Sequence, residues 1–192
     1  MNHTSPRVAV SNTGPLISAL QSNCMHILLQ FYDQIHIPAD EIIEYQKHGA
    51  GQAISDLLDA GFLVVHQDFT PDEIDAALAI AVEIASHRIT RDRTPSHHLA
   101  ESFAIMLMLR SNFRAVELLI DELAARDVAT QRKVSLIGFP GILIRACRQR
   151  IIGPDDVLNA LTECQRQGTH YSPKLINEIY SNLKRSQHEK EI

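Results

Sequence analysis

Short apolar runs alternate along the chain with longer segments in which apolar residues recur every three or four positions. A short apolar run bounded by turn residues is typical of a buried strand, and the longer period is typical of an amphipathic helix. Strands are therefore predicted at residues 7–11, 35–37, 62–65, 117–120 and 134–136. Helices are predicted at residues 15–31, 39–47, 51–60, 71–87, 97–112, 122–131, 139–149, 154–166 and 173–184. Strands that alternate with helices indicate an α/β fold with a mostly parallel central sheet and helices on both faces.

Length and composition narrow the class of protein. A chain of 192 residues, 45% of them apolar, can bury one core of ordinary size, so we expect a single domain over residues 1–192. Its last part, residues 153–185, is expected to form a C-terminal helical extension. The three cysteines have no paired spacing, which argues against a disulfide framework or a zinc knuckle and fits a reducing cytoplasm.

The chain also shows no signal for export or for a membrane. Its first ten residues lack the basic and then apolar order of a signal peptide, and no apolar run approaches the roughly 20 residues that span a bilayer. We therefore expect a cytoplasmic protein without membrane contact. The net charge of −5 argues against a surface devoted mainly to phosphate, but it leaves room for a local basic patch.

The first predicted strand ends in a turn of small polar residues, in the stretch "RVAVSNTGPLISAL". The turn, residues 11–15, is followed at once by an apolar helical pattern. In α/β folds the carboxyl ends of the strands are where ligands gather. This turn is therefore the first place to look for a functional site.

Four oxygen-bearing side chains form a candidate metal site. Asn12 ends the first strand, Asp121 ends the strand "ELLID", and Glu44 and Glu101 lie on predicted helices. If the strands are parallel, Asn12 and Asp121 share one edge of the sheet, where the two glutamates could reach them. Such a set could hold one Mg²⁺ or Mn²⁺, because these cations prefer oxygen ligands. The alternative is that the glutamates are solvated, Asp121 caps a helix and Asn12 only forms the turn.

Several segments, in order, resemble the PIN-domain superfamily, in the bacterial branch related to VapC toxins. They are "VAVSNTGPLISAL", "IHIPADEIIEYQ", "HHLAESFAIML", "ELLIDELAAR" and "IIGPDDVLNALTECQRQGTHYSPKLINEIYSNL". The resemblance covers nearly the whole chain, and its first and last segments are the most specific. It implies a three-layer α/β/α fold and cleavage of RNA that depends on Mg²⁺ or Mn²⁺. It also implies RNA as a partner and, as possible partners, an antitoxin protein and a second copy of the chain.

Carried over by position, the resemblance assigns roles to single residues. Asn12 stands where most PIN nucleases have the first metal-binding Asp, although Asn is frequent in this branch. Glu44, Glu101 and Asp121 match the other acidic positions, so metal binding is expected of all four residues. Catalytic roles are expected of Asp121, Glu101 and Glu44, since a carboxylate can orient the attacking water and accept its proton.

The sequence departs from the family pattern at several places. Ala100 and Phe103 replace the Gly and the second Glu of a Gly-Glu-x-Glu-Ala-Ile motif, and Glu122 replaces what is often a second Asp. Loss of negative charge at Asn12 and Phe103 should weaken a cation site. A catalytically degenerate protein that binds RNA or a protein partner without cleavage is therefore a second hypothesis, and a pure interaction subunit is a third.

Candidate RNA contacts are a hydroxyl and four arginines. Thr13 could donate to a phosphate, Arg88, Arg91 and Arg93 lie in a polar loop, and Arg126 lies one helical turn after Asp121. Contacts of this kind make RNA binding depend on salt. The alternative is that Thr13 only closes the turn and that the arginines belong to a solvated surface.

Overall fold

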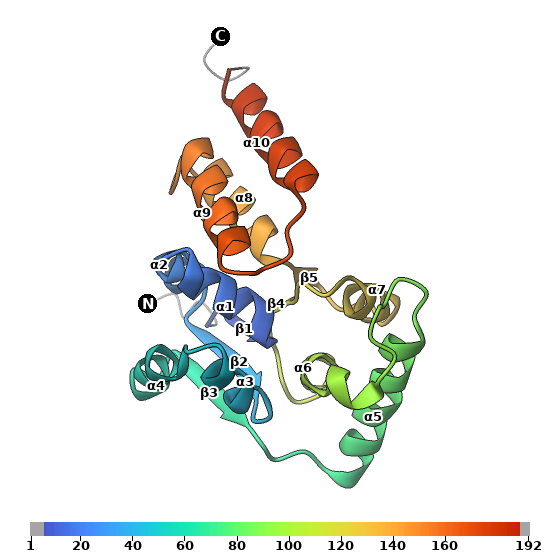
Figure 1. The fold of residues 1–192 in the computed structure, drawn as a ribbon. Coiled ribbons are helices and arrows are strands. Elements are labelled where there is room, and N and C mark those ends of the chain that lie inside the picture. Colours follow the sequence, from blue (N-terminus) through green and yellow to red (C-terminus); the bar gives the residue numbers. More distant parts are fainter. Residues whose placement is uncertain (1–5, 189–192) are drawn as a thin grey trace.

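A computed structural model describes residues 6–188 of the chain (Figure 1). The two ends of the predicted domain, residues 1–5 and 189–192, lie outside the described residues. The first ten residues, whose order of basic and apolar residues argues against a signal peptide, thus lie partly outside the described residues.

The centre of the fold is a five-stranded sheet in the order β3-β2-β1-β4-β5. Its strands are β1 (Val8–Ser11), β2 (Gln34–Pro38), β3 (Leu63–His66), β4 (Glu117–Leu119) and β5 (Leu136–Ile137). Every neighbouring pair is parallel. The predicted α/β class with a parallel sheet is thus confirmed, since each predicted strand overlaps an observed one.

Helices join and cover the strands. They are α1 (Thr13–Gln21), α2 (Met25–Phe31), α3 (Glu41–Lys47), α4 (Gly51–Asp59), α5 (Pro71–Ser86), α6 (Leu99–Leu109), α7 (Leu123–Gln131), α8 (Phe139–Arg148), α9 (Pro154–Arg166) and α10 (Pro173–His188). A short 3-10 helix, Pro95–His98, leads into α6. None of the helices that the structure describes is long and apolar enough to cross a membrane.

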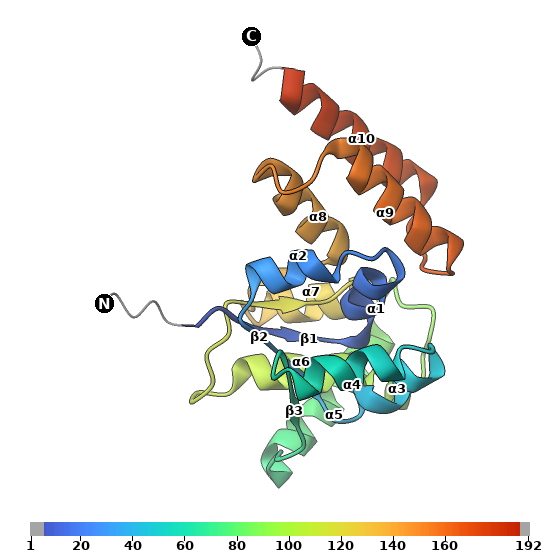
Figure 2. The ribbon, with the colours of Figure 1, turned by 90° about the vertical axis from the view of Figure 1, so that its left-hand side faces the viewer.

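Alternating side chains of the strands divide the core between the two faces of the sheet. Ala9 and Leu119 pack with α1, α2 and α8, whereas Val10 and Leu118 pack with α5, α6 and α7. This alternation is the two-residue period of a strand that is buried on both faces. The C-terminal helices α9 and α10 lie side by side beyond α8 and continue the first of these two clusters (Figure 2).

The prediction of one helix over residues 15–31 is wrong, because two helices occupy this range. The chain breaks into α1 and α2 between Ser22 and Cys24, where Asn23 has a φ of 55°. This left-handed backbone ends an α-helix, and asparagine tolerates it better than most residues because its side chain is short and polar. Apolar periodicity continues across the break, so the pattern alone does not reveal it.

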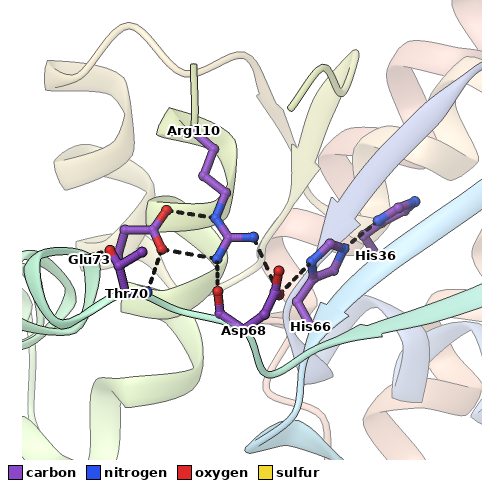
Figure 3. A network of polar contacts seen from close by, with 6 residues as sticks. All are labelled: His36, His66, Asp68, Thr70, Glu73 and Arg110. Atoms are coloured by element: carbon purple, nitrogen blue, oxygen red, sulfur yellow. Dashed lines mark hydrogen bonds and ion pairs between the residues drawn. The ribbon is translucent and has the colours of Figure 1, made fainter. Parts of the chain in front are cut away.

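A polar network ties the edge of the sheet to α5 and the end of α6 (Figure 3). His36 Nδ1 lies 2.6 Å from His66 Nε2, and His66 Nδ1 lies 3.5 Å from Asp68. Arg110 donates to Glu73 at 2.7 Å and also pairs with Asp68. Burial lowers the pKa of His36 to about 4 and also lowers the pKa of His66. The two rings are therefore neutral at pH 7 and can share one N–H···N hydrogen bond.

We expect the free energy of unfolding to fall as the pH drops from about 6.5 toward 4. His36 binds a proton near pH 6.5 when unfolded but only near pH 4 when folded, so acid favours the unfolded chain. Because the ring is only half buried, its contribution should be on the order of 1 to 2 kcal/mol. Urea unfolding at several pH values checks this, with His36→Gln as the comparison. An equal pH slope in the variant would contradict the assignment.

Candidate active site

The candidate site lies where the order of the strands reverses. The chain runs outward from β1 to β3 and then returns to place β4 on the other side of β1. Asn12 directly follows β1, and its N–H donates to the carbonyl of Leu119, the last residue of β4, at 3.1 Å. Asp121 comes two residues later. A switch point of this kind leaves a crevice at the carboxyl edge of a parallel sheet.

Asn12 and Asp121 face the same point at this edge. An ideal Cβ built on Gly14 would lie 3.9 Å from both Asn12 Oδ1 and Asp121 Oδ2. The absence of a side chain at Gly14 therefore leaves room between the two groups. The predicted proximity of Asn12 and Asp121 agrees with this geometry.

The two predicted glutamates reach the turn from flanking helices. Asn12 Nδ2 donates to Glu101 Oε1 from α6 at 3.2 Å, and Thr13 Oγ1 donates to Glu44 Oε2 from α3 at 3.2 Å. All four predicted metal-site residues thus gather around the turn after β1. Thr13 holds a carboxylate there, so its hydroxyl does more than close the turn.

A fourth acidic residue, Glu41, is buried beside this set. Its side chain has no exposed surface, and Tyr45 donates to its Oε2 at 3.0 Å. Burial raises the pKa of Glu41 well above its usual range, and the nearby charges of Glu101 and Glu44 act in the same direction. Glu41 was not among the residues predicted from the sequence. Its spacing of three residues from Glu44, one turn on the same helix face, was the available signal.

Asp121 is held at both oxygens. Phe139 donates its backbone N–H to Oδ1 at 2.9 Å, and Tyr171 donates its hydroxyl to Oδ2 at 2.9 Å. Tyr171 also lies 3.0 Å from the Ser18 hydroxyl. Burial raises the pKa of Asp121, while the two hydrogen bonds and Arg126 oppose that rise. Tyr171 was missed in the sequence because it comes from the loop between α9 and α10, fifty residues further along the chain.

The buried carboxyls have few cations to compensate them. Burial raises the pKa of Glu101, and the charge of Glu44 adds to this effect. The charge of Arg126 opposes the rise in the pKa of Asp121, and Arg126 Nη1 donates to the carbonyl of Ile120 at 2.7 Å. A bound divalent cation would lower these pKa values and displace protons, as metal binding to carboxylates generally does.

Three buried oxygens of the site lack any hydrogen-bond donor among the described residues. They are Asn12 Oδ1, Glu101 Oε2 and Glu41 Oε1. An unsatisfied buried acceptor is costly, and oxygens of this type are the ligands that Mg²⁺ and Mn²⁺ take. Within residues 6–188, no group of three or more Asp, Glu, His or Cys side chains is arranged to enclose an ion by itself. Mg²⁺ usually keeps several waters and needs only one or two carboxylates, so the residues present fit such a cation.

Phe103 stands where the family motif has its second Glu, and its side chain does not join the site. Its ring packs on Phe69 with centroids 4.8 Å apart. Residues two apart on a helix face different directions, which explains why Phe103 does not join Glu101 at the site. Glu122 instead caps α7 by accepting a hydrogen bond from the N–H of Ala125.

The predicted RNA-binding arginines fall into two groups. Arg126 lies at the site, whereas Arg88, Arg91 and Arg93 lie in the loop between α5 and the 3-10 helix. Arg93 donates to the carbonyls of two residues at the end of α5, Ala85 and His87, and so supports the loop itself. In the described part of the chain, no ion pair joins these three arginines to the carboxylates of the site. Their role in RNA binding remains a prediction.

We expect Gly138→Ala to destabilise the protein by about 1 to 3 kcal/mol, as overpacking does. A Cβ at this position would lie 2.5 Å from Asp121 Oδ1 and 2.9 Å from Arg126 Nη1, so both side chains would have to move. Thermal and urea unfolding measure the effect. Gly51→Ala is the control, since its Cβ would meet only Gln46 at 3.5 Å. Equal stability of the two variants would contradict this account of Gly138.

Comparison with known proteins agrees with the fold. A family model described as PIN domain matches residues 8–185, which is most of the chain. Searches of curated proteins and of solved structures returned no match. PIN domains form a nuclease-type superfamily whose members generally use divalent metal ions. The match extends from β1 through most of α10, and the chain therefore belongs to the PIN-domain family.

Proposed function

We propose that this protein is a Mg²⁺- or Mn²⁺-dependent ribonuclease that acts at the carboxyl edge of its sheet. The observation that carries the proposal is the group of buried oxygens without donors, Asn12 Oδ1, Glu101 Oε2 and Glu41 Oε1. Two of these oxygens belong to Glu41 and Glu101, and burial raises the pKa values of both carboxyls. Strongly perturbed carboxyls at a crevice are typical of functional sites.

Asn12, Glu101, Glu44 and Asp121 are the residues that would hold the cation. When bound, a divalent cation polarises a phosphate oxygen and lowers the pKa of a water molecule. Asn12 would contribute a neutral oxygen in place of a carboxylate, so the site would carry less negative charge than one with Asp. Lower ligand charge predicts weaker cation binding.

Glu101 is the better candidate for the proton acceptor. Its Oε1 accepts from Asn12, but its Oε2 has no donor among the described residues. Its raised pKa brings a carboxylate closer to neutral pH, where a general base works best. Both Asp121 oxygens are already bonded, which suits a carboxylate that is fixed in place and orients its neighbours.

A second candidate function is RNA or protein binding without cleavage. It is favoured by the neutral Asn12 and by the Asp121 carboxylate, whose oxygens both accept hydrogen bonds from the protein. A cation would have to share or displace these donors to bind Asp121 directly. A protein of this kind would bind its partner without turnover.

A toxin role forms part of the first proposal. In it an antitoxin partner would block the nuclease, and a second copy of the chain could form a homodimer. Growth arrest on expression that requires Glu101 would support the toxin role.

We expect Mn²⁺-dependent cleavage of RNA by the purified protein and a loss of at least about a hundredfold in Glu101→Gln, the usual scale for a general base. Asn12→Asp should increase cleavage at limiting Mn²⁺, because it adds a charged ligand. Gel analysis of several structured RNAs, with and without Mn²⁺, measures both effects. Glu178→Gln, on the exposed side of α10, is the control. It makes the same loss of charge away from the site and is purified in the same way, so it should cleave like the parent protein.

The outcomes separate the two candidate functions. Cleavage that survives in Glu101→Gln would point to a contaminating nuclease. No cleavage by the parent chain, together with cleavage by Asn12→Asp, would favour the degenerate protein. No cleavage by either would count against the nuclease proposal.

A further inference from the structure

The two carboxylate oxygens of Asp121 face different surroundings. Oδ1 lies toward Gly138, where an ideal Cβ would be 2.5 Å away, and it accepts the backbone N–H of Phe139. Oδ2 lies toward Gly14, and Asn12 Oδ1 approaches the same point. Because Asn12 Oδ1 has no donor among the described residues, Oδ2 is the Asp121 oxygen on the side of the proposed cation.

A hydroxyl of the protein already occupies this oxygen. Tyr171 donates to Asp121 Oδ2 at 2.9 Å, and a phenol has only one proton to donate. The Ser18 hydroxyl lies 3.0 Å from the same phenol oxygen, so Ser18 is the donor in that pair. Both side chains are buried, with Tyr171 7% and Ser18 1% exposed. The phenol proton therefore lies beside Oδ2, where a cation would otherwise place its charge.

The loop between α9 and α10, which carries Tyr171, is held against the end of α1 by side-chain hydrogen bonds. Thr169 Oγ1 donates to Gln21 Oε1 at 2.8 Å, and Gln167 Nε2 donates to the carbonyl of Gln21 at 3.0 Å. Gln165 of α9 donates to the carbonyl of Tyr171 at 2.9 Å. The position of the phenol thus depends on how the C-terminal segment packs on the N-terminal part of the fold.

Two roles of the Tyr171 hydroxyl lead to opposite predictions. A donor that supports a metal ligand holds that ligand in place, and its loss weakens metal binding by about 10- to 100-fold. A donor that competes with the cation must leave Oδ2 first, so its loss strengthens metal binding.

The contacts of the site favour competition. The Phe139 N–H on Oδ1 already orients the Asp121 carboxylate, so a second donor is not needed for that purpose. The oxygens Asn12 Oδ1 and Glu101 Oε2 have no donor among the described residues, as expected of oxygens left open for a cation. The hydroxyl on Oδ2 is the exception in this set, and it comes from a segment outside the sheet.

We propose that the Tyr171 hydroxyl competes with the cation for Asp121 Oδ2, so that the packing of the C-terminal helices controls how tightly the cation binds. The inference rests on the proposed nuclease function and adds a form of regulation to its site. In the cation-bound protein, the phenol no longer donates to Oδ2 and keeps only its contact with Ser18. The loop before α10 then loses one of the contacts that hold it.

The test is calorimetric titration of Mn²⁺ into the full chain and into Tyr171→Phe, a measurement that needs no cleavage. We expect Mn²⁺ to bind Tyr171→Phe about tenfold more tightly, the scale of one hydrogen bond to a charged group. Tyr180→Phe is the matched control, because it also removes a phenol hydroxyl that donates to an aspartate, Asp155 at 2.8 Å, but this contact joins α10 to α9 outside the site. Equal or weaker binding in Tyr171→Phe, or equally tightened binding in Tyr180→Phe, would overturn the proposal.

A second variant loosens the loop without a change at Asp121. Thr169→Val keeps the shape of the side chain but removes its hydrogen bond to Gln21. It should strengthen Mn²⁺ binding by about two- to threefold, since a neutral hydrogen bond contributes less than one to a charged group. Circular dichroism shows whether each variant is folded, and Thr169→Val decides the matter if Tyr171→Phe is not. Unchanged or weaker binding in folded Thr169→Val would overturn the control of the cation by this loop.

Amide hydrogen exchange measures the same coupling from the loop, because linkage between two events is reciprocal. The N–H groups of Thr169 and Tyr171 donate to the carbonyls of Cys164 and Thr169, so their exchange reports on the loop. We expect Mn²⁺ to speed exchange in residues 167–172 of the parent chain but not in Tyr171→Phe. Unchanged or slower exchange in the parent chain at saturating Mn²⁺ would overturn the proposal.

Failure of this proposal differs from failure of the proposed function. If neither the parent chain nor Tyr171→Phe binds Mn²⁺, the cation site itself is wrong and the role of Tyr171 is overturned with it. If both bind Mn²⁺ with equal affinity, the cation site stands and only the role of Tyr171 is overturned. Binding by Tyr171→Phe alone would give the strongest support.

Discussion

Parallel pairing between β1 and β4 brings together two chain segments that are far apart in sequence, and the candidate site depends on this contact. Val10 lies beside Leu118 and Ser11 beside Leu119 in the register of the two strands. Because the strands run in the same direction, the residues that follow them emerge at one edge. The apolar side chains on both faces fix the register, since a slip of one residue would turn the buried set to the wrong face.

Burial of several carboxyls at the carboxyl edge of the sheet costs folding free energy. Glu41 is wholly buried, and burial raises the pKa of Glu41, Glu101 and Asp121. Donors from four different segments offset part of this cost, through Thr13, Tyr45, Phe139 and Tyr171. Three buried oxygens still have no donor among the described residues, on Asn12, Glu101 and Glu41. Buried acceptors of this kind are expected where a protein binds a cation or a substrate. Function, rather than stability, accounts best for so many acids in one place.

Much of the fold could be predicted because local patterns encode it. Apolar runs and caps marked each strand and most helices, and the alternation of elements implied a parallel sheet. From that sheet the closeness of Asn12 and Asp121 followed. Glu44 and Glu101 were candidates because they lie on helices that flank this edge, and the resemblance to the PIN family then matched all four residues to its acidic positions. The roles of these residues in metal binding and catalysis remain predictions.

Other features depend on contacts that no local pattern carries. Tyr171 reaches Asp121 only because α9 and α10 fold back beyond α8, and Gly138 is required only because Asp121 and Arg126 approach it. The direction of Phe103 follows from how α6 is rotated against the sheet and Phe69. The break at Asn23 depends on a single left-handed residue inside a continuous apolar pattern.

The central claim is that the buried oxygens gathered at the carboxyl ends of β1 and β4 form a cation site. Calorimetric titration with Mn²⁺ in two buffers of different ionisation enthalpy tests it most directly, because the difference gives the number of protons released. We expect saturable binding accompanied by proton release, because burial raises the pKa values of Glu101 and Glu41 and a bound cation would lower them. Glu101→Gln should weaken both signals. Absence of saturable binding, or binding unchanged in Glu101→Gln, would contradict the account.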